Sequence, residues 1–177
     1  MTANGKRHKG GFTLLELLIT IGIIVIVSTM ILPISKRLKE RAEQVKCMSH
    51  MRTIHSSFTG YVSDKGEWPQ LPPEEEDWDE NKFYRFWVRS LEPYGANRDL
   101  WLCPSDKVYQ QMWKERKKTK DRYFGSYGPT PFDDNPGTPF RWNQPWLIER
   151  GDFHGKGGHM LMPDGSIHEA QNPFHGR

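Results

Sequence analysis

A block of 21 residues near the start of the chain, Phe12 to Leu32, constrains the fold more than any other feature. Fifteen of its residues are apolar, and Glu16 is its one charged residue. A helix needs about 20 apolar residues to cross the hydrocarbon core of a bilayer. The block is longer than the apolar region of a secretory signal peptide, and no small-x-small cleavage site follows it. Residues 12–32 are therefore predicted to form a transmembrane helix.

The rest of the chain differs from this N-terminal region in apolar content and in net charge. Apolar residues make up only 36% of the 177 residues, so the part outside the block can bury only a small core. This excludes a large single-core enzyme and a protein with many membrane spans. The net charge of +3 comes from Lys6, Arg7 and Lys9, because the remainder balances at 22 basic and 22 acidic residues. These three residues predict a cytoplasmic N-terminus and give no reason to expect nucleic-acid binding.

Glu16 is the residue that fits a membrane helix least well. A carboxylate near the bilayer centre costs roughly 2.5–3.5 kcal/mol on insertion scales, although Glu16 lies near the helix end. Two interpretations remain open. The helix N-terminus can stabilise a negative charge at the membrane interface, or the carboxylate has a functional partner of opposite charge.

The residues around Glu16 resemble a known family. Gly11 followed by FTLLELL resembles the signal of type IV pilins and type II secretion pseudopilins, which have a Gly before the cleaved bond, an aromatic first mature residue and a Glu at the fifth mature position. The resemblance implies that a prepilin peptidase cuts between Gly11 and Phe12 and methylates the new amine. It also implies that Glu16 pairs with the N-terminal ammonium of a neighbouring subunit, and opposite charges attract strongly in a low dielectric.

The resemblance also implies a structural role and not an enzyme: a subunit of a type II secretion pseudopilus or type IV pilus-like filament. Before assembly it would cross the inner membrane once, with its N-terminus cytoplasmic and its head periplasmic. The implied partners are the prepilin peptidase, other pilin-like subunits, an inner-membrane assembly platform and the lipid bilayer. One alternative stays open. A membrane-anchored envelope enzyme or polysaccharide-binding protein would use its many Trp and Tyr residues on sugars, although core packing is the better default for aromatics.

The helix is predicted to continue beyond the membrane. Pro33 removes one helical hydrogen bond and is expected to kink or break the helix locally; a proline here also resembles the family. Over residues 33–62, apolar residues recur at three- and four-residue steps, which predicts an amphipathic helix that continues into the head. The expected inward positions are Leu38, Ala42, Val45, Met48, Met51 or Arg52, His55, Phe58 and Val62.

Residues 63–177 are predicted to form a small α+β head with an antiparallel sheet and irregular loops. An acidic, Pro-rich stretch at 63–81 predicts a surface loop. Residues 82–92 predict a short helix with Phe83, Phe86, Trp87 and Leu91 inward, and the basic run 114–122 predicts a solvated helix end or loop. A hairpin is expected near the end, with strands 158–162 and 166–170 around Asp164 and Gly165.

The sequence leaves the cysteine chemistry of the head open. Cys47 and Cys103 permit one disulfide on the oxidising side of a membrane. The sequence does not show whether their Cα atoms are within reach, so separate thiols or buried small hydrophobic residues stay open as alternatives. No metal site is predicted, because His154, His159, His168 and His175 match no compact zinc spacing. No cofactor is predicted either, with calcium in the loops 63–81 or 133–137 as a weaker expectation.

A final resemblance concerns the end of the chain, and no catalytic motif accompanies it. His154, nine residues and then Asp164-Gly165 resemble the H-x9-DG tail motif of pseudopilin-like proteins common in planctomycetes. Cys103-Pro104-Ser105-Asp106, with Cys47 and Tyr127-Gly128, resembles the same group more loosely. The sequence contains no nucleophile elbow, phosphate loop or zinc-protease helix, and no catalytic residue is predicted.

Overall fold

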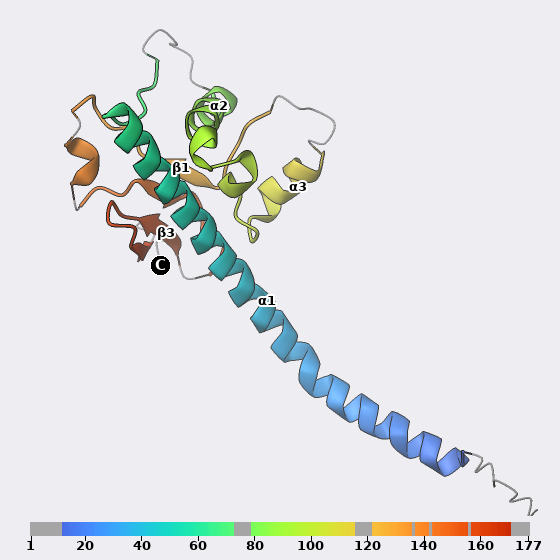
Figure 1. Cartoon of the computed structure of the whole chain (residues 1–177). Coiled ribbons are helices and arrows are strands. Elements are labelled where there is room, and N and C mark those ends of the chain that lie inside the picture. Colours follow the sequence, from blue (N-terminus) through green and yellow to red (C-terminus); the bar gives the residue numbers. More distant parts are fainter. Residues whose placement is uncertain are drawn as a thin grey trace, which may run out of the picture. The chain divides into compact units, whose positions relative to one another are not determined.

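The computed structural model describes residues 12–72, 79–115, 122–135, 137–141, 143–155 and 157–170, with the backbone alone for 30–33 and 170. The chain divides into two compact units, Met1–Lys39 and Glu40–Arg177, which are described separately below (Figure 1). The predicted leader 1–11 with Gly11, the loop centre 73–78, most of the basic run 114–122 and His175 lie outside the described residues.

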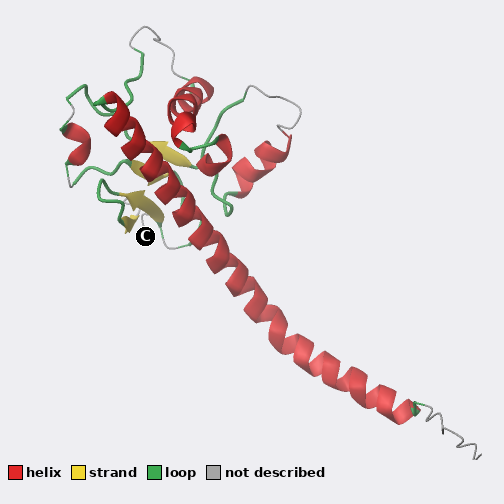
Figure 2. Ribbon diagram, in the orientation of Figure 1, coloured by secondary structure: helices red, strands yellow, loops and turns green. Residues whose placement is uncertain are grey.

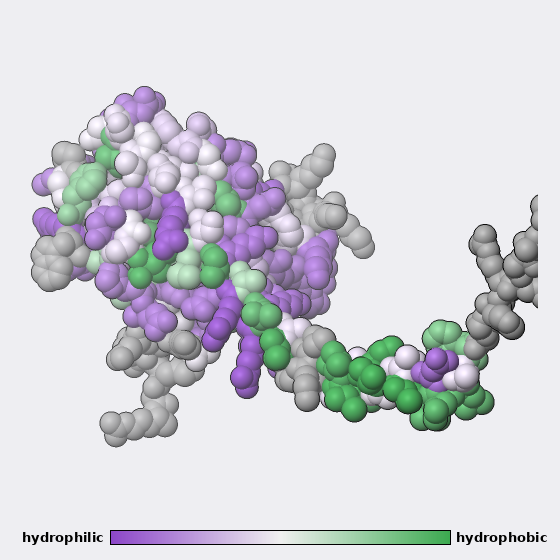
Figure 3. Space-filling model, turned by 60° about the horizontal axis from the view of Figure 1, so that its bottom comes forward, coloured by the Kyte–Doolittle hydropathy of each residue, from purple (hydrophilic) through white to green (hydrophobic). Residues whose placement is uncertain are grey.

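Helix α1, Leu14–Lys65, begins in the first unit, where Phe12 and Thr13 precede it. Its large apolar side chains there are exposed, from Leu14 at 80% to Ile34 at 56%. An apolar helix with no protein packed against it is typical of a membrane span, and α1 is long and apolar enough to cross a bilayer. On the face in Figure 3, most of the side chains drawn along the N-terminal part of α1 are hydrophobic, whereas the head is mainly hydrophilic.

Of the two expectations at Pro33, the break is wrong, because the backbone is helical from Met30 through Pro33 and α1 continues to Lys65. The local kink stays a prediction. Proline fixes φ near the helical value. It removes one hydrogen-bond donor, and a long helix can lose that bond and still continue.

In the second unit, α1 packs against the head through Cys47, Met51, Ile54 and Phe58, all fully buried. These residues follow the expected spacing of three and four, but the stripe is rotated from the predicted one. Val45, which was expected to point inward, is 60% exposed. The pattern around Val45 offered several apolar faces, and contacts with distant segments decide which face is buried.

In the described part of the head, two further α-helices and short 3₁₀ turns accompany α1. Helix α2 spans Glu80–Leu91, and Asp79 caps it by accepting a hydrogen bond from the Lys82 amide. Helix α3 spans Lys107–Glu115, and 3₁₀ turns cover Glu92–Tyr94, Arg98–Trp101 and Thr138–Phe140. The α2 prediction is confirmed in place but corrected in its face, which buries Tyr84, Trp87, Val88 and Leu91, with Phe83 and Phe86 only half-buried.

Four short strands form one antiparallel sheet in the order β1-β2-β3-β4, so the predicted α+β class is confirmed (Figure 2). Their bounds are Tyr127–Pro129, Leu147–Glu149, Gly158–Leu161 and Ile167–Ala170. The predicted terminal hairpin is confirmed, since β3 pairs with β4 from Gly158 opposite Ala170 to Leu161 opposite Ile167.

Aromatic side chains supply the core of the head, as a chain poor in Val and Ile requires. The Phe58 ring stacks on Trp68 at 4.3 Å and meets Trp87 and Trp146 edge-on at 5.8 and 6.0 Å between ring centroids. Such pairs contribute about 0.5–1.5 kcal/mol each beyond the area they bury. The centre of the head is therefore a cluster of aromatic rings that all contact Phe58 of α1.

Candidate functional site

The first candidate site is the start of α1, where Thr13 and Glu16 bind each other. The Thr13 amide and hydroxyl both donate to Glu16 Oε2, at 2.9 and 2.8 Å, and the Glu16 amide donates to Thr13 Oγ1 at 3.2 Å. This reciprocal arrangement is a capping box, which satisfies amide groups that a helix start leaves without partners. The local geometry explains how a single chain can tolerate a carboxylate in this segment.

Sequence reasoning missed the role of Thr13, although the signal was present. The sequence Thr13-x-x-Glu16 is the spacing of a capping box, and it was hidden because Glu16 was considered only as a charge in an apolar run. The cap satisfies hydrogen bonds but does not neutralise the carboxylate. A carboxylate at this position therefore still lacks a partner of opposite charge within the described part of its own unit.

The apolar surface that follows Glu16 is the second part of this site. Leu15, Leu17 and Leu18 are 67%, 58% and 58% exposed, and further exposed apolar side chains follow as far as Val27. Soluble monomers rarely leave so much contiguous apolar surface uncovered. Lipid tails or the equivalent helices of other subunits can cover it.

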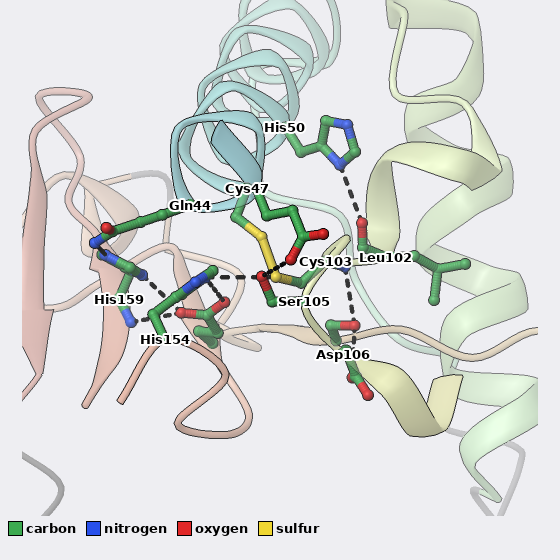
Figure 4. The surroundings of a disulfide bond; sticks show 12 residues. Gln44, Cys47, His50, Leu102, Cys103, Ser105, Asp106, His154 and His159 are labelled. Atoms are coloured by element: carbon green, nitrogen blue, oxygen red, sulfur yellow. Dashed lines mark hydrogen bonds and ion pairs between the residues drawn. A yellow bond between two sulfur atoms is a disulfide. The ribbon is translucent and has the colours of Figure 1, made fainter. Parts of the chain in front are cut away.

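The second candidate site lies in the head, where Cys47 on α1 and Cys103 form a disulfide (Figure 4). The pair closes a separation of 56 residues, which in the loop-entropy picture stabilises the fold by about 4 kcal/mol. His50 adds a second link between α1 and this region, since its Nδ1 lies 3.1 Å from the Leu102 carbonyl. The bond ties the helix to the head.

The turn after Cys103 fixes the position of its backbone. Asp106 donates its amide to the Cys103 carbonyl at 3.0 Å. Ser126 Oγ accepts the Cys103 amide at 3.0 Å and donates to Asp106 Oδ2 at 2.8 Å. These buried bonds give Cys103-Pro104-Ser105-Asp106 a structural role, so the Cys103 side chain projects from a fixed turn.

Three ionisable side chains, those of Glu149, His154 and His159, form a cluster beside the disulfide. His154 Nε2 lies 3.5 Å from Cys103 Sγ and 3.3 Å from Glu149 Oε1. His159 Nδ1 lies 2.7 Å from Glu149 Oε2, and the His159 amide donates to the same oxygen at 3.0 Å. The three side chains are 4%, 0% and 3% exposed for His154, Glu149 and His159. The sequence singled out the two histidines but not Glu149, which gave no signal in a short strand.

The environment shifts the pKa values of this group. Burial alone would raise the pKa of Glu149, but the two neighbouring imidazoles outweigh it and lower the pKa. The hydrogen bond to Glu149 raises the pKa of His159 against the opposing effect of burial. Glu149 is therefore held as a carboxylate within a buried polar cluster.

The two halves of the tail motif do different things. His154 faces the disulfide, whereas Asp164 and Gly165 form the β3–β4 turn, in which Asp164 Oδ1 accepts the Ser166 amide at 2.9 Å. Gly165 adopts φ +81°, a conformation that favours glycine. The Pro163 carbonyl of this turn lies 2.9 Å from His55 Nε2 on α1. The turn docks the hairpin onto the helix.

The loops expected to bind calcium do not gather ligands in their described parts. Asp133 Oδ1 accepts the Asn135 amide and Asn135 Oδ1 accepts the Gly137 amide, at 3.2 and 2.9 Å, so these oxygens serve the loop itself. Among the described residues, the acidic, Cys and His donors that converge on one point are Cys47, Cys103, Glu149 and His154. The calcium expectation stays a prediction.

Comparison with known proteins points to the N-terminal site. Residues 6–32 match the family described as "Prokaryotic N-terminal methylation motif". The chain is similar to type II secretion system core protein G of Aeromonas hydrophila, 33% identical over 36% of this chain and 45% of that protein. It is also similar to type II secretion system core protein G of Dickeya chrysanthemi, 24% identical over 78% of this chain and 89% of that protein. No solved structure matches it significantly.

Proposed function

Because this chain belongs to the family of type IV pilins and type II secretion pseudopilins and is a pilin-like subunit, we propose that it assembles into a type II secretion pseudopilus. Prepilin peptidase cuts between Gly11 and Phe12 and methylates the amine of Phe12. The mature subunits then associate through α1. Glu16 of one subunit pairs with the N-terminal ammonium of its neighbour.

One observation carries this proposal: a motif that matches residues 6–32 introduces an exposed apolar helix with a charged carboxylate one turn from the cleavage point. Neither an ammonium nor a carboxylate is stable alone in a low dielectric, and together they attract strongly. Pairing between subunits relieves the burial cost only in the assembled state. The charge thus favours assembly over dispersal in the membrane.

The location of the subunit follows from the same end. The basic residues before the apolar block favour a cytoplasmic N-terminus, which leaves the head on the periplasmic side of the inner membrane. The named relatives, which are type II secretion proteins, support the secretion machine over a pilus. An inner-membrane platform and the other pseudopilins are the proposed partners.

The experiment separates the charge of Glu16 from its role as a cap. In Glu16→Gln, the side chain keeps its shape and can still complete a capping box, but the charge is lost. We expect filament yield to fall at least about tenfold, which a loss of about 1.4 kcal/mol in pairing already produces. Sheared filaments and membrane-bound subunits are measured by immunoblot in a strain that has the secretion genes.

Two variants serve as controls. Thr13→Ala removes the cap, at a cost of about 1 kcal/mol, but keeps the carboxylate, so we expect a smaller loss. Glu92→Gln removes an exposed carboxylate of the head and is expected to assemble normally. Normal assembly of Glu16→Gln, or a failure of Thr13→Ala as complete as that of Glu16→Gln, contradicts the pairing role.

The alternative of an envelope polysaccharide-binding protein or enzyme is not favoured. Trp68, Trp87, Trp101 and Trp146 are at most 1% exposed, so they form the core and offer no face to a sugar. Trp113 packs edge-on against Phe124 at 6.2 Å between ring centroids. The described tryptophans thus have packing roles, as expected for a structural head.

A further inference from the structure

The head contains a buried cluster that its role as a filament subunit does not require. Cys47, Cys103, Glu149 and His154 come from α1, the turn before α3, strand β2 and the loop before β3. Their ligand atoms all lie within 4.8 Å of one another. We propose that the thiol form of this head binds one Zn²⁺ through Cys47 Sγ, Cys103 Sγ, His154 Nε2 and Glu149 Oε1.

The donor set has the chemistry of a structural zinc site. Zinc takes thiolate, imidazole and carboxylate ligands in four-coordinate tetrahedral geometry, and its structural sites are closed to water. Cys47 and Cys103 are fully buried, and the side chains of His154 and Glu149 are 4% and 0% exposed. Calcium and magnesium prefer oxygen ligands, so the two sulfurs favour zinc over both.

The distances already match two edges of such a site. With zinc bonds of about 2.3 Å to sulfur and about 2.0–2.2 Å to nitrogen and oxygen, a tetrahedron has S–N edges near 3.6 Å and N–O edges near 3.4 Å. Cys103 Sγ lies 3.5 Å from His154 Nε2, which lies 3.3 Å from Glu149 Oε1. The edge between the two sulfurs would be about 3.8 Å long. In the thiol form, rotation of the two cysteine side chains can separate the sulfurs to that distance.

The Glu149 carboxylate is held in the orientation that a ligand needs. Its Oε2 is engaged by the amide and the ring of His159. Its Oε1 is buried, and its contact is the ion pair with His154 Nε2 at 3.3 Å, which does not meet hydrogen-bond geometry. Oε1 and His154 Nε2 therefore face each other across the place where a shared metal ion would lie. His159 would act as the outer partner that orients the ligand.

A disulfide alone does not account for these neighbours. The sulfurs of a disulfide are weak acceptors and need neither a buried carboxylate nor two buried imidazoles. Disulfide and zinc are alternative states of the same cysteine pair. In a chain whose thiols have not yet been oxidised, two thiols bind one Zn²⁺ and release two protons. From the disulfide, a dithiol reductant first supplies two electrons and two protons and becomes a disulfide itself.

The test measures Zn²⁺ and Co²⁺ binding to the full chain in detergent, with and without a phosphine reductant. We expect the reduced chain to bind one Zn²⁺ per molecule and to give the visible bands of tetrahedral Co²⁺ with thiolate-to-metal charge transfer. The oxidised chain is expected to bind neither ion at this site. Near-ultraviolet circular dichroism of the buried tryptophans reports whether the head stays folded.

Variants that keep both cysteines define the other ligands. Glu149→Gln and His154→Gln are each expected to weaken Zn²⁺ binding by about 100-fold or more, the upper end of the losses seen when a ligand's outer partner is removed. His168→Gln is the matched control, because His168 lies on exposed β4 and contacts Ser166; it is expected to bind as the unchanged chain does.

Any one of three results would overturn the proposal. The first is that the reduced chain binds no more Zn²⁺ than the oxidised chain, and the second is that Glu149→Gln and His154→Gln bind Zn²⁺ as tightly as His168→Gln. The third is that the reduced head unfolds and Zn²⁺ does not restore its circular dichroism. These outcomes are independent of filament assembly, so they leave the proposed function untouched.

Discussion

At the scale of single residues, the position of Glu16 at the start of α1 determines its hydrogen bonds. In a single chain, Glu16 accepts two hydrogen bonds from Thr13, which satisfies its oxygen but leaves its charge. In the proposed filament, the same carboxylate pairs with the ammonium of another subunit.

At Gly165, replacement by Ala should destabilise the head by about 1–2 kcal/mol, the cost of a left-handed conformation in a residue with a Cβ. The glycine has φ +81°, and an added Cβ would lie 3.3 Å from His55 Cε1. Urea unfolding followed by tryptophan fluorescence measures the change. Gly137→Ala is the control, because φ there is −83°; equal midpoints for the two variants would contradict the turn's role.

At the scale of elements, the described part of α1 has two different surfaces. In the first unit it is exposed and apolar, and in the second it buries a stripe centred on Met51, Ile54 and Phe58. The stripe is narrow because only one face meets the head. Packing of this face, with the hairpin turn docked at His55, assembles the head on the helix.

Phe58→Ala should cost about 3–5 kcal/mol of unfolding free energy, because it removes a large ring from the centre of the aromatic core. Phe58 is fully buried and contacts three tryptophans. The control is Val45→Ala on the same helix, where the side chain is 60% exposed and a change within about 0.5 kcal/mol is expected. Similar denaturation midpoints for both variants would show that the stripe has been placed on the wrong face.

Local patterns predicted these elements, but contacts between distant segments were harder to predict. The hairpin followed from Asp164-Gly165 between short strands, and α2 followed from its apolar spacing. The predicted inward position was wrong at Val45, and the prediction for α2 left out the buried Tyr84 and Val88, since several apolar faces were available on each helix. Glu149 could not be predicted as a partner of His154, because a carboxylate in a three-residue strand reveals nothing about which loop folds over it.

At the scale of the whole molecule, the chain combines a membrane-anchoring helix with a small head that α1 and a disulfide hold together. In the proposed function, the apolar helices of several subunits associate laterally. The head carries the chemistry of Cys47 and Cys103, which is separate from assembly. In the proposed function, cleavage after Gly11 creates the ammonium with which Glu16 pairs.

The most direct test is the N-terminal residue and intact mass of the protein purified from membranes of a strain with an active prepilin peptidase. We predict a chain that begins at N-methylated Phe12, while the same strain without the peptidase retains residues 1–11. A full-length chain that still carries residues 1–11 after complete exposure to the peptidase would contradict the account.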